Sequence, residues 1–159
     1  YDLCALKTQP AERAQLDLSS WRVALNGAEP IRKETEERFL ATFEPCGLRP
    51  DTLSHAFGMS EATAKVASEH IGMANVFVPL NPADYEQNRA RLLKADDPRA
   101  RWVAGCGVMT GDTTIAIADP ETLTKLPDTH IGEVWIRGKT VAQGYWNNPE
   151  AVCHFWAWH

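Results

Sequence analysis

The sequence has few cysteines, no long apolar run and little positive charge. Its 159 residues include only four cysteines, which are far apart and form no Cys-x-x-Cys pair. Neither a structural zinc site nor a disulfide framework is therefore expected. No apolar run approaches the roughly 18 residues that a transmembrane helix needs. Positive charge is scarce as well, and the net charge of −5 argues against nucleic acid as a partner.

The chain also lacks an initial methionine and a basic segment followed by an apolar one. The absence of such a leader predicts a cytoplasmic protein. The first residue, Tyr1, opens directly on a segment that reads as structured, and the last five residues, 155–159, hold three large aromatics. Because exposed chain ends are rarely so apolar, we expect an interior fragment of a longer protein.

What is present is typical of a globular protein, with 44% hydrophobic and 23% charged residues. In the first part, the pattern predicts strands at 21–25 and 53–57 and helices from Thr8 and over 31–43. The solvated face of the second helix is expected to carry Glu34, Glu36 and Glu37. This order of strand, turn, helix, strand and turn predicts an open α/β sheet with its ligand at the carboxyl ends of the strands.

The pattern changes after Thr63. We expect short strands at 64–68 and 76–80, a polar helix at 82–93, and short strands at 101–104, 113–118 and 132–137. Turns rich in Gly, Pro and Asp separate the last three strands, which predicts a β-rich subdomain. The chain is thus expected to divide into a nucleotide-binding α/β part at 1–66, a connecting segment at 67–105 and a truncated β-rich subdomain at 106–159.

Two glycine-containing turns lie about thirty residues apart, roughly the length of one βα unit with its return strand. The first comprises Asn26, Gly27, Ala28, Glu29 and Pro30, and the second comprises Phe57, Gly58, Met59, Ser60, Glu61, Ala62 and Thr63. Glycine lets the backbone approach a planar ligand closely. The second turn adds an aromatic face for adenine, and a hydroxyl and a carboxylate for a phosphate with its Mg²⁺. Together the turns predict a nucleotide-binding surface.

Both turns resemble motifs of the adenylate-forming enzymes, the superfamily of acyl-CoA synthetases, luciferases and peptide-synthetase adenylation domains. The first is similar to the Gly-Ala-Glu-Pro turn that contacts adenine, and the second to the aromatic-Gly-x-Thr-Glu motif. A third stretch, 132–150, is similar to the Gly-Glu-hydrophobic and Gly-Tyr segment of these enzymes. The resemblance spans nearly the whole chain and implies part of the large N-terminal domain of such an enzyme.

Within this superfamily the chain most resembles the long-chain fatty acyl-AMP ligases, through 1–4, 16–30 and 61–63. The polar stretch between Ser68 and Cys106 matches in position an insertion that CoA-forming relatives lack. The resemblance implies fatty acid metabolism, with ATP, Mg²⁺ and a fatty acid as ligands. It also implies an acyl-carrier protein, or a polyketide or peptide synthetase module, as the partner that receives the acyl group.

The resemblance also assigns roles to the residues of the second turn. Phe57 would stack on adenine where the family usually has Tyr, which keeps the aromatic face and loses a hydroxyl. Gly58 and Met59 would bring backbone amides near the phosphates, and Ser60 would offer its hydroxyl to the α-phosphate. Glu61 would be the catalytic residue and the ligand of Mg²⁺, a cation that prefers carboxylate and phosphate oxygens.

In the first turn, the resemblance implies that Asn26, Gly27, Ala28 and Glu29 border the adenine, mainly through their backbone. His55 lies two residues before Phe57. It is interpreted as a strand histidine whose hydrogen bonds are satisfied, rather than as a catalytic base.

Three parts of the family's machinery have no counterpart in the sequence. These are the Ser/Thr/Gly-rich phosphate loop, the Thr-Gly-Asp segment that binds ribose, and the lid with its catalytic Lys. We therefore expect the chain alone to be inactive. Two alternatives stay open: an acyl-CoA ligase, which the stretch between Ser68 and Cys106 disfavours, and a non-catalytic module that binds acyl-AMP or a protein partner.

Overall fold

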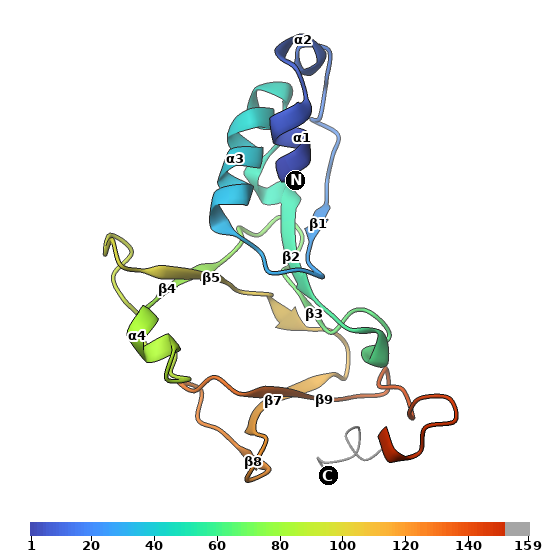
Figure 1. Cartoon of the computed structure of the whole chain (residues 1–159). Coiled ribbons are helices and arrows are strands. Elements are labelled where there is room, and N and C mark those ends of the chain that lie inside the picture. The colour runs from blue at the N-terminus through green and yellow to red at the C-terminus, as the bar shows by residue number, and fades with distance from the viewer. Residues whose placement is uncertain (152–159) are drawn as a thin grey trace. The chain divides into compact units, whose positions relative to one another are not determined.

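A computed structural model describes residues 1–151 of the chain (Figure 1). The aromatic stretch 155–159, which the sequence singled out, lies outside the described residues. The chain forms two compact units that alternate along the sequence. The first unit comprises Tyr1–Ala56, Ser68–Val78 and Trp102–Val108, and the second comprises Phe57–Ala67, Pro79–Arg101 and the chain from Met109 on. The expected divisions at 1–66, 67–105 and 106–159 stay predictions.

The first unit opens with two short helices, α1 (Asp2–Lys7) and α2 (Pro10–Arg13), followed by strand β1 (Ala24–Asn26) and helix α3 (Lys33–Phe43). The strand is shorter than the expected 21–25 and lies closer to the glycine turn. Two 3-10 turns, η1 (Glu44–Cys46) and η2 (Pro50–Thr52), then lead into β2 (Leu53–Phe57), whose bounds are as expected. Gly47 follows η1 with φ of 87°, a left-handed conformation that favours glycine at the end of a helix.

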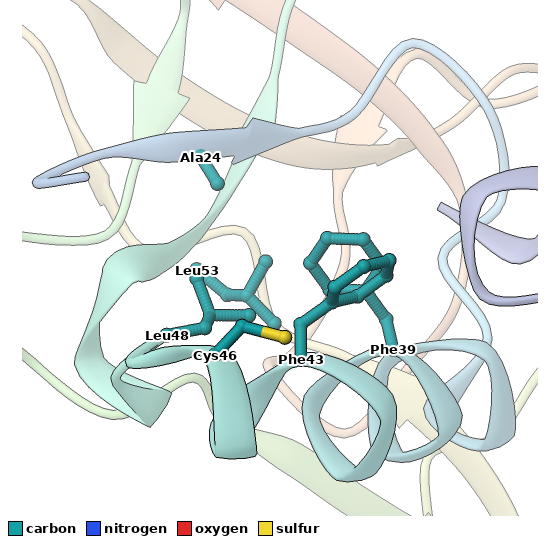
Figure 2. Close-up of a cluster of buried hydrophobic side chains, with 6 residues drawn as sticks. All are labelled: Ala24, Phe39, Phe43, Cys46, Leu48 and Leu53. Atoms are coloured by element: carbon teal, nitrogen blue, oxygen red, sulfur yellow. The ribbon is translucent and has the colours of Figure 1, made fainter. Parts of the chain in front are cut away.

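The core of the first unit lies between α3 and the strands. Its buried members, drawn in Figure 2, are Ala24, Phe39, Phe43, Cys46, Leu48 and Leu53. Phe39 and Phe43 are one helical turn apart, and their ring centroids lie 4.8 Å from each other. Burying each such side chain contributes about 1.5–3 kcal/mol. Tyr1 packs edge-on against Phe39, so α1 is held along α3 (Figure 1).

Strands β1 and β2 pair in parallel, with Ala24 opposite Leu53 and Asn26 opposite His55. Parallel strands end at the same edge of a sheet, so the turn after β1 lies beside the end of β2. A Cβ atom on Gly27 would come within 2.4 Å of the Ala56 carbonyl oxygen. Only glycine therefore fits this close approach, in agreement with the expected α/β arrangement.

The second unit contains an antiparallel three-stranded sheet. Its strands are β7 (Thr114–Asp119), β8 (Thr124–Lys125) and β9 (Glu133–Arg137), in the order β8-β7-β9. In the longer pair, Ala116 lies opposite Trp135. Alternate residues of β7, Ala116 and Ala118, are buried. The expected strands at 113–118 and 132–137 agree with β7 and β9 to within one residue at each end.

The remaining elements are short: η3 (Ser60–Ala62), β3 (Ala67–Ser68), β4 (Phe77–Leu80), α4 (Pro82–Tyr85), β5 (Arg101–Ala104) and β6 (Val108–Met109). No helix within residues 1–151 has the length and the apolar character needed to cross a membrane.

The expectation of a helix over 82–93 is wrong. Helix α4 ends after a single turn, and Asn88 follows with a left-handed φ of 56°. The backbone beyond it makes strand-like pairs instead, since Arg89 bridges to His130 and Leu92 to Leu80. Local polarity favoured a helix, but long-range pairing decided the conformation.

Candidate nucleotide-binding site

The first turn, which follows β1, presents mainly backbone. Ala28 adopts a left-handed φ of 66°, which turns the chain sharply after Gly27. Ala28 and Glu29 are exposed, whereas Asn26 and Gly27 are half-buried. The tight approach of Gly27 to Ala56 places this turn against the residue that immediately precedes Phe57 in the chain. Contacts of residues 26–29 with adenine stay a prediction.

The second turn, in the second unit, is a loop closed on itself. Val66 donates its backbone N–H to the Phe57 carbonyl, and Ala64 donates to the Met59 carbonyl, both at 3.0 Å. A Cβ atom on Gly58 would lie 1.5 Å from the Ala64 carbonyl oxygen, so only glycine fits. The loop leaves Met59 and Ser60 exposed and Phe57 half-buried.

The backbone conformation after η3 also shows that this loop is tightly constrained. Thr63 and Ala64 have φ values of 56° and 67°, two consecutive left-handed residues that are not glycine. Such conformations are costly and persist only where the surrounding contacts enforce them. The loop that carries the candidate phosphate and metal ligands is therefore held in one shape.

Glu61 is the candidate metal ligand, and other parts of the second unit hold it in place. The Ala142 N–H donates to the Glu61 carbonyl at 2.7 Å. The Tyr145 hydroxyl donates to the Glu61 side chain at Oε1. This hydrogen bond holds the pKa of the Glu61 carboxyl below its usual value, so the side chain is a carboxylate at neutral pH.

A single carboxylate of this kind suits Mg²⁺, which is usually held by one or two carboxylates together with substrate phosphates and water. Within residues 1–151 no cluster of three or more His, Cys, Asp or Glu side chains could hold a metal ion without a substrate. The donor set thus fits a metal that arrives with a nucleotide, and the roles of Phe57, Ser60 and Glu61 stay predictions.

The first unit contains a buried acid–histidine pair that joins α3 to β2. His55 is fully buried and Glu36 is 6% exposed, with 2.7 Å between His55 Nε2 and Glu36 Oε2. The expectation that Glu36 lies on a solvated helix face is therefore wrong. Glu36 stands three and seven residues before Phe39 and Phe43, on the buried face of α3. That spacing was the signal that the sequence offered.

Hydrogen bonds account for each polar atom of the pair. His55 Nδ1 lies 2.9 Å from the Gly105 carbonyl oxygen, which can only accept, so Nδ1 carries a proton. The Asn75 amide donates to Glu36 Oε1 at 2.7 Å, and its oxygen accepts the His55 backbone N–H at 3.1 Å. The interpretation of His55 as a satisfied strand histidine is confirmed.

The surroundings of both partners favour their charged forms. Burial raises the pKa of Glu36, but hydrogen bonds from His55, Asn75 and the Asn26 side chain outweigh it, and the pKa falls below the usual value. Burial lowers the pKa of His55, but the hydrogen bond to Glu36 outweighs it, and the pKa rises. Both shifts favour an imidazolium beside a carboxylate. The hydrogen bond between Glu36 and His55 links α3 to β2.

Comparisons with known proteins agree with these features. The family model described as AMP-binding enzyme matches residues 1–146. A medium-chain-fatty-acid–[acyl-carrier-protein] ligase, JamA, of Moorena producens is 41% identical over 152 residues, which are 94% of this chain and 26% of that protein.

Two solved structures from Legionella pneumophila are similar over 97% of this chain and 27% of theirs. A fatty acid AMP ligase has a TM-score of 0.91 at 32% identity. A fatty acyl-adenylate ligase in complex with acyl adenylate and pyrophosphate has a TM-score of 0.90 at 33% identity. The chain therefore spans about a quarter of the length of these relatives. Its mixed α/β fold is that of part of the N-terminal domain of adenylate-forming enzymes, as the sequence predicted.

Proposed function

The chain belongs to the AMP-binding enzyme family, and we propose that the protein containing it is a fatty acyl-AMP ligase. Such a protein activates a fatty acid with ATP to acyl-adenylate and passes the acyl group to an acyl-carrier protein. One observation carries the proposal: the glycine-closed loop 57–66 holds an aromatic ring, an exposed hydroxyl and an ionised carboxylate in a fixed shape. The similarity to a structure that contains acyl adenylate and pyrophosphate supports the same reaction.

In this reaction the fatty carboxylate attacks the α-phosphorus of ATP, and pyrophosphate leaves. Mg²⁺ held by Glu61 would neutralise negative charge on the phosphates. Phe57 offers its ring to adenine, and the Ser60 hydroxyl, exposed on the loop, is available to donate to an α-phosphate oxygen. Because the backbone contacts of Gly58 leave the loop little freedom, its main chain is preorganised rather than ordered on binding.

The test is ATP–pyrophosphate exchange that depends on a fatty acid. We expect the full-length protein to catalyse it and residues 1–159 alone to give none. The chain lacks counterparts of the phosphate loop, the ribose-binding Asp and the lid Lys, which together position the reacting groups. Exchange by residues 1–159 at saturating ATP would contradict the expectation that this chain alone is inactive. Absence of exchange in the full-length protein with every fatty acid supplied would support the non-catalytic alternative.

A second expected result concerns the acceptor of the acyl group. With fatty acid, ATP and CoA, the full-length protein should stop at acyl-adenylate, and it should proceed only with an acyl-carrier protein. If the insertion-like stretch restricts the lid, as the resemblance implies, removing part of it should allow acyl-CoA to form. Efficient formation of acyl-CoA by the intact protein would instead favour the acyl-CoA ligase alternative.

Part of the insertion-like stretch supports the buried pair of the first unit. Asn75 and Gly105 both hydrogen-bond the buried pair, so removing the whole stretch from Ser68 to Cys106 would disrupt the first unit. The deletion should be confined to residues 81–100, which connect β4 to β5 and belong to the second unit. A short Gly-Ser linker then joins Leu80 to Arg101, and a normal rate of acyl-adenylate formation serves as the control for folding.

A further inference from the structure

A segment after β9 fastens the loop that carries Glu61 at three points within the second unit. The Thr63 hydroxyl donates to the Thr140 carbonyl at 2.7 Å, and the Ala142 N–H donates to the Glu61 carbonyl at 2.7 Å. The third contact is made by side chains, since the Tyr145 hydroxyl donates to Glu61 Oε1. These contacts join residues about eighty positions apart, so residues 140–145 hold the loop in place.

We propose that Tyr145 is a positioning residue, which orients the Glu61 carboxylate toward the metal that accompanies the nucleotide. This inference rests on the proposed function, because it takes Glu61 to be the metal ligand. It adds a residue outside the two glycine turns, to which the sequence assigned no role.

The contacts of the Thr63 hydroxyl and the Glu61 carbonyl hold the main chain of the loop but leave the Glu61 side chain free to rotate. A glutamate has several rotatable bonds, and ordering it costs conformational entropy. A hydrogen bond from Tyr145 to one carboxylate oxygen selects one orientation before the metal arrives. The ligand is then preorganised, and its ordering does not have to be offset by metal binding.

The chemistry of a tyrosine suits this task. Its hydroxyl is neutral and donates one hydrogen bond, so Glu61 keeps its full negative charge. A lysine or arginine in the same place would orient the carboxylate but also neutralise it. A carboxylate has about four lone-pair sites, so a contact at Oε1 leaves Oε2 available to a cation. The arrangement holds the carboxylate without competing for its charge.

The experiment replaces Tyr145 by Phe in the full-length protein. We expect the Mg²⁺ concentration for half-maximal pyrophosphate exchange to rise about tenfold, the order expected for loss of a hydrogen bond to a charged group. The KM for the fatty acid should not change. Binding of Mn²⁺, measured by electron paramagnetic resonance in the presence of a non-hydrolysable ATP analogue, should weaken by a similar factor.

The matched control is Tyr85→Phe. Tyr85 belongs to the same unit, and its ring centroid lies 4.1 Å from the Arg101 guanidinium. The variant removes the hydroxyl and keeps this ring contact. Metal dependence should be unchanged in this variant. A second control combines Tyr145→Phe with Glu61→Gln. If Tyr145 acts through Glu61, the double variant should resemble Glu61→Gln alone, whereas a purely structural role would give additive losses.

The outcomes separate this inference from the proposed function. Unchanged Mg²⁺ dependence and Mn²⁺ affinity in Tyr145→Phe, in a protein that does catalyse exchange, would overturn the positioning role alone. Absence of fatty-acid-dependent exchange in the wild type would overturn the proposed function. The Mn²⁺ measurement still decides the role of Tyr145 in that case, because it does not require turnover.

Discussion

Replacing Glu61 by Gln in the full-length protein should lower kcat for acyl-adenylate formation by about 100-fold or more, by analogy with the loss of one preorganised electrostatic contact. The substitution keeps the size of the side chain and removes the negative charge that would hold Mg²⁺. That charge matters most where phosphate charge shifts as pyrophosphate leaves, so kcat should fall far more than ATP affinity. Steady-state pyrophosphate exchange and equilibrium binding of ATP measure the two quantities separately.

The matched control for this prediction is Glu86→Gln. Glu86 is an exposed carboxylate of the same unit, just after α4, and the change there should leave kcat unchanged. A Glu61→Gln enzyme with wild-type kcat would show that Glu61 is only a surface carboxylate. An equal loss of kcat in both variants would point to a general effect of net charge instead.

Replacing Glu36 by Ala should lower the free energy of unfolding by about 3–5 kcal/mol, the usual cost of removing one partner of a buried ion pair. The variant leaves His55 buried without its acid, and the Asn75 amide without an acceptor. Chemical denaturation of the full-length protein measures the loss. The double variant Glu36→Leu with His55→Leu should lose less than the sum of the two single variants, since it leaves no unpaired charge.

The contribution of this pair to stability should depend on pH. The pKa of His55 is raised from 6.5, so its contribution is complete below 6.5 and is lost as pH rises through the folded-state value. Glu36 has a pKa lowered from 4.5, so its contribution is complete above 4.5 and is lost as pH falls through the folded-state value. Glu69 also raises the pKa of His55.

The difference in stability between wild type and Glu36→Ala should therefore be largest between about pH 4.5 and 6.5 and should shrink on both sides. Denaturation curves from pH 4 to 9 measure it. A difference that stays constant across this range would mean that the pair does not carry charge. The exposed Glu37→Ala, on the same helix, provides a control that leaves the buried pair intact.

Local sequence determined several features of the molecule. The bounds of β2 were predicted correctly, and in the two candidate nucleotide-binding turns glycines stand where the backbone comes too close for a Cβ atom, at Gly27 and Gly58. Phe39 and Phe43, one helical turn apart, form the face of α3 that packs on the strands. These features follow from neighbouring residues, and so do the motifs that predicted the family.

Tertiary structure alone decided the rest. The polar stretch after α4 forms bridges to Leu80 and His130 instead of continuing as a helix. The partner of the buried Glu36 is His55, which comes from a strand nineteen positions further along the chain. The contact of Tyr145 with Glu61 crosses 84 positions of sequence. Periodicity and propensity report on residues within a few positions of one another, whereas these contacts form only when separate segments pack together, and no local pattern encodes their partners.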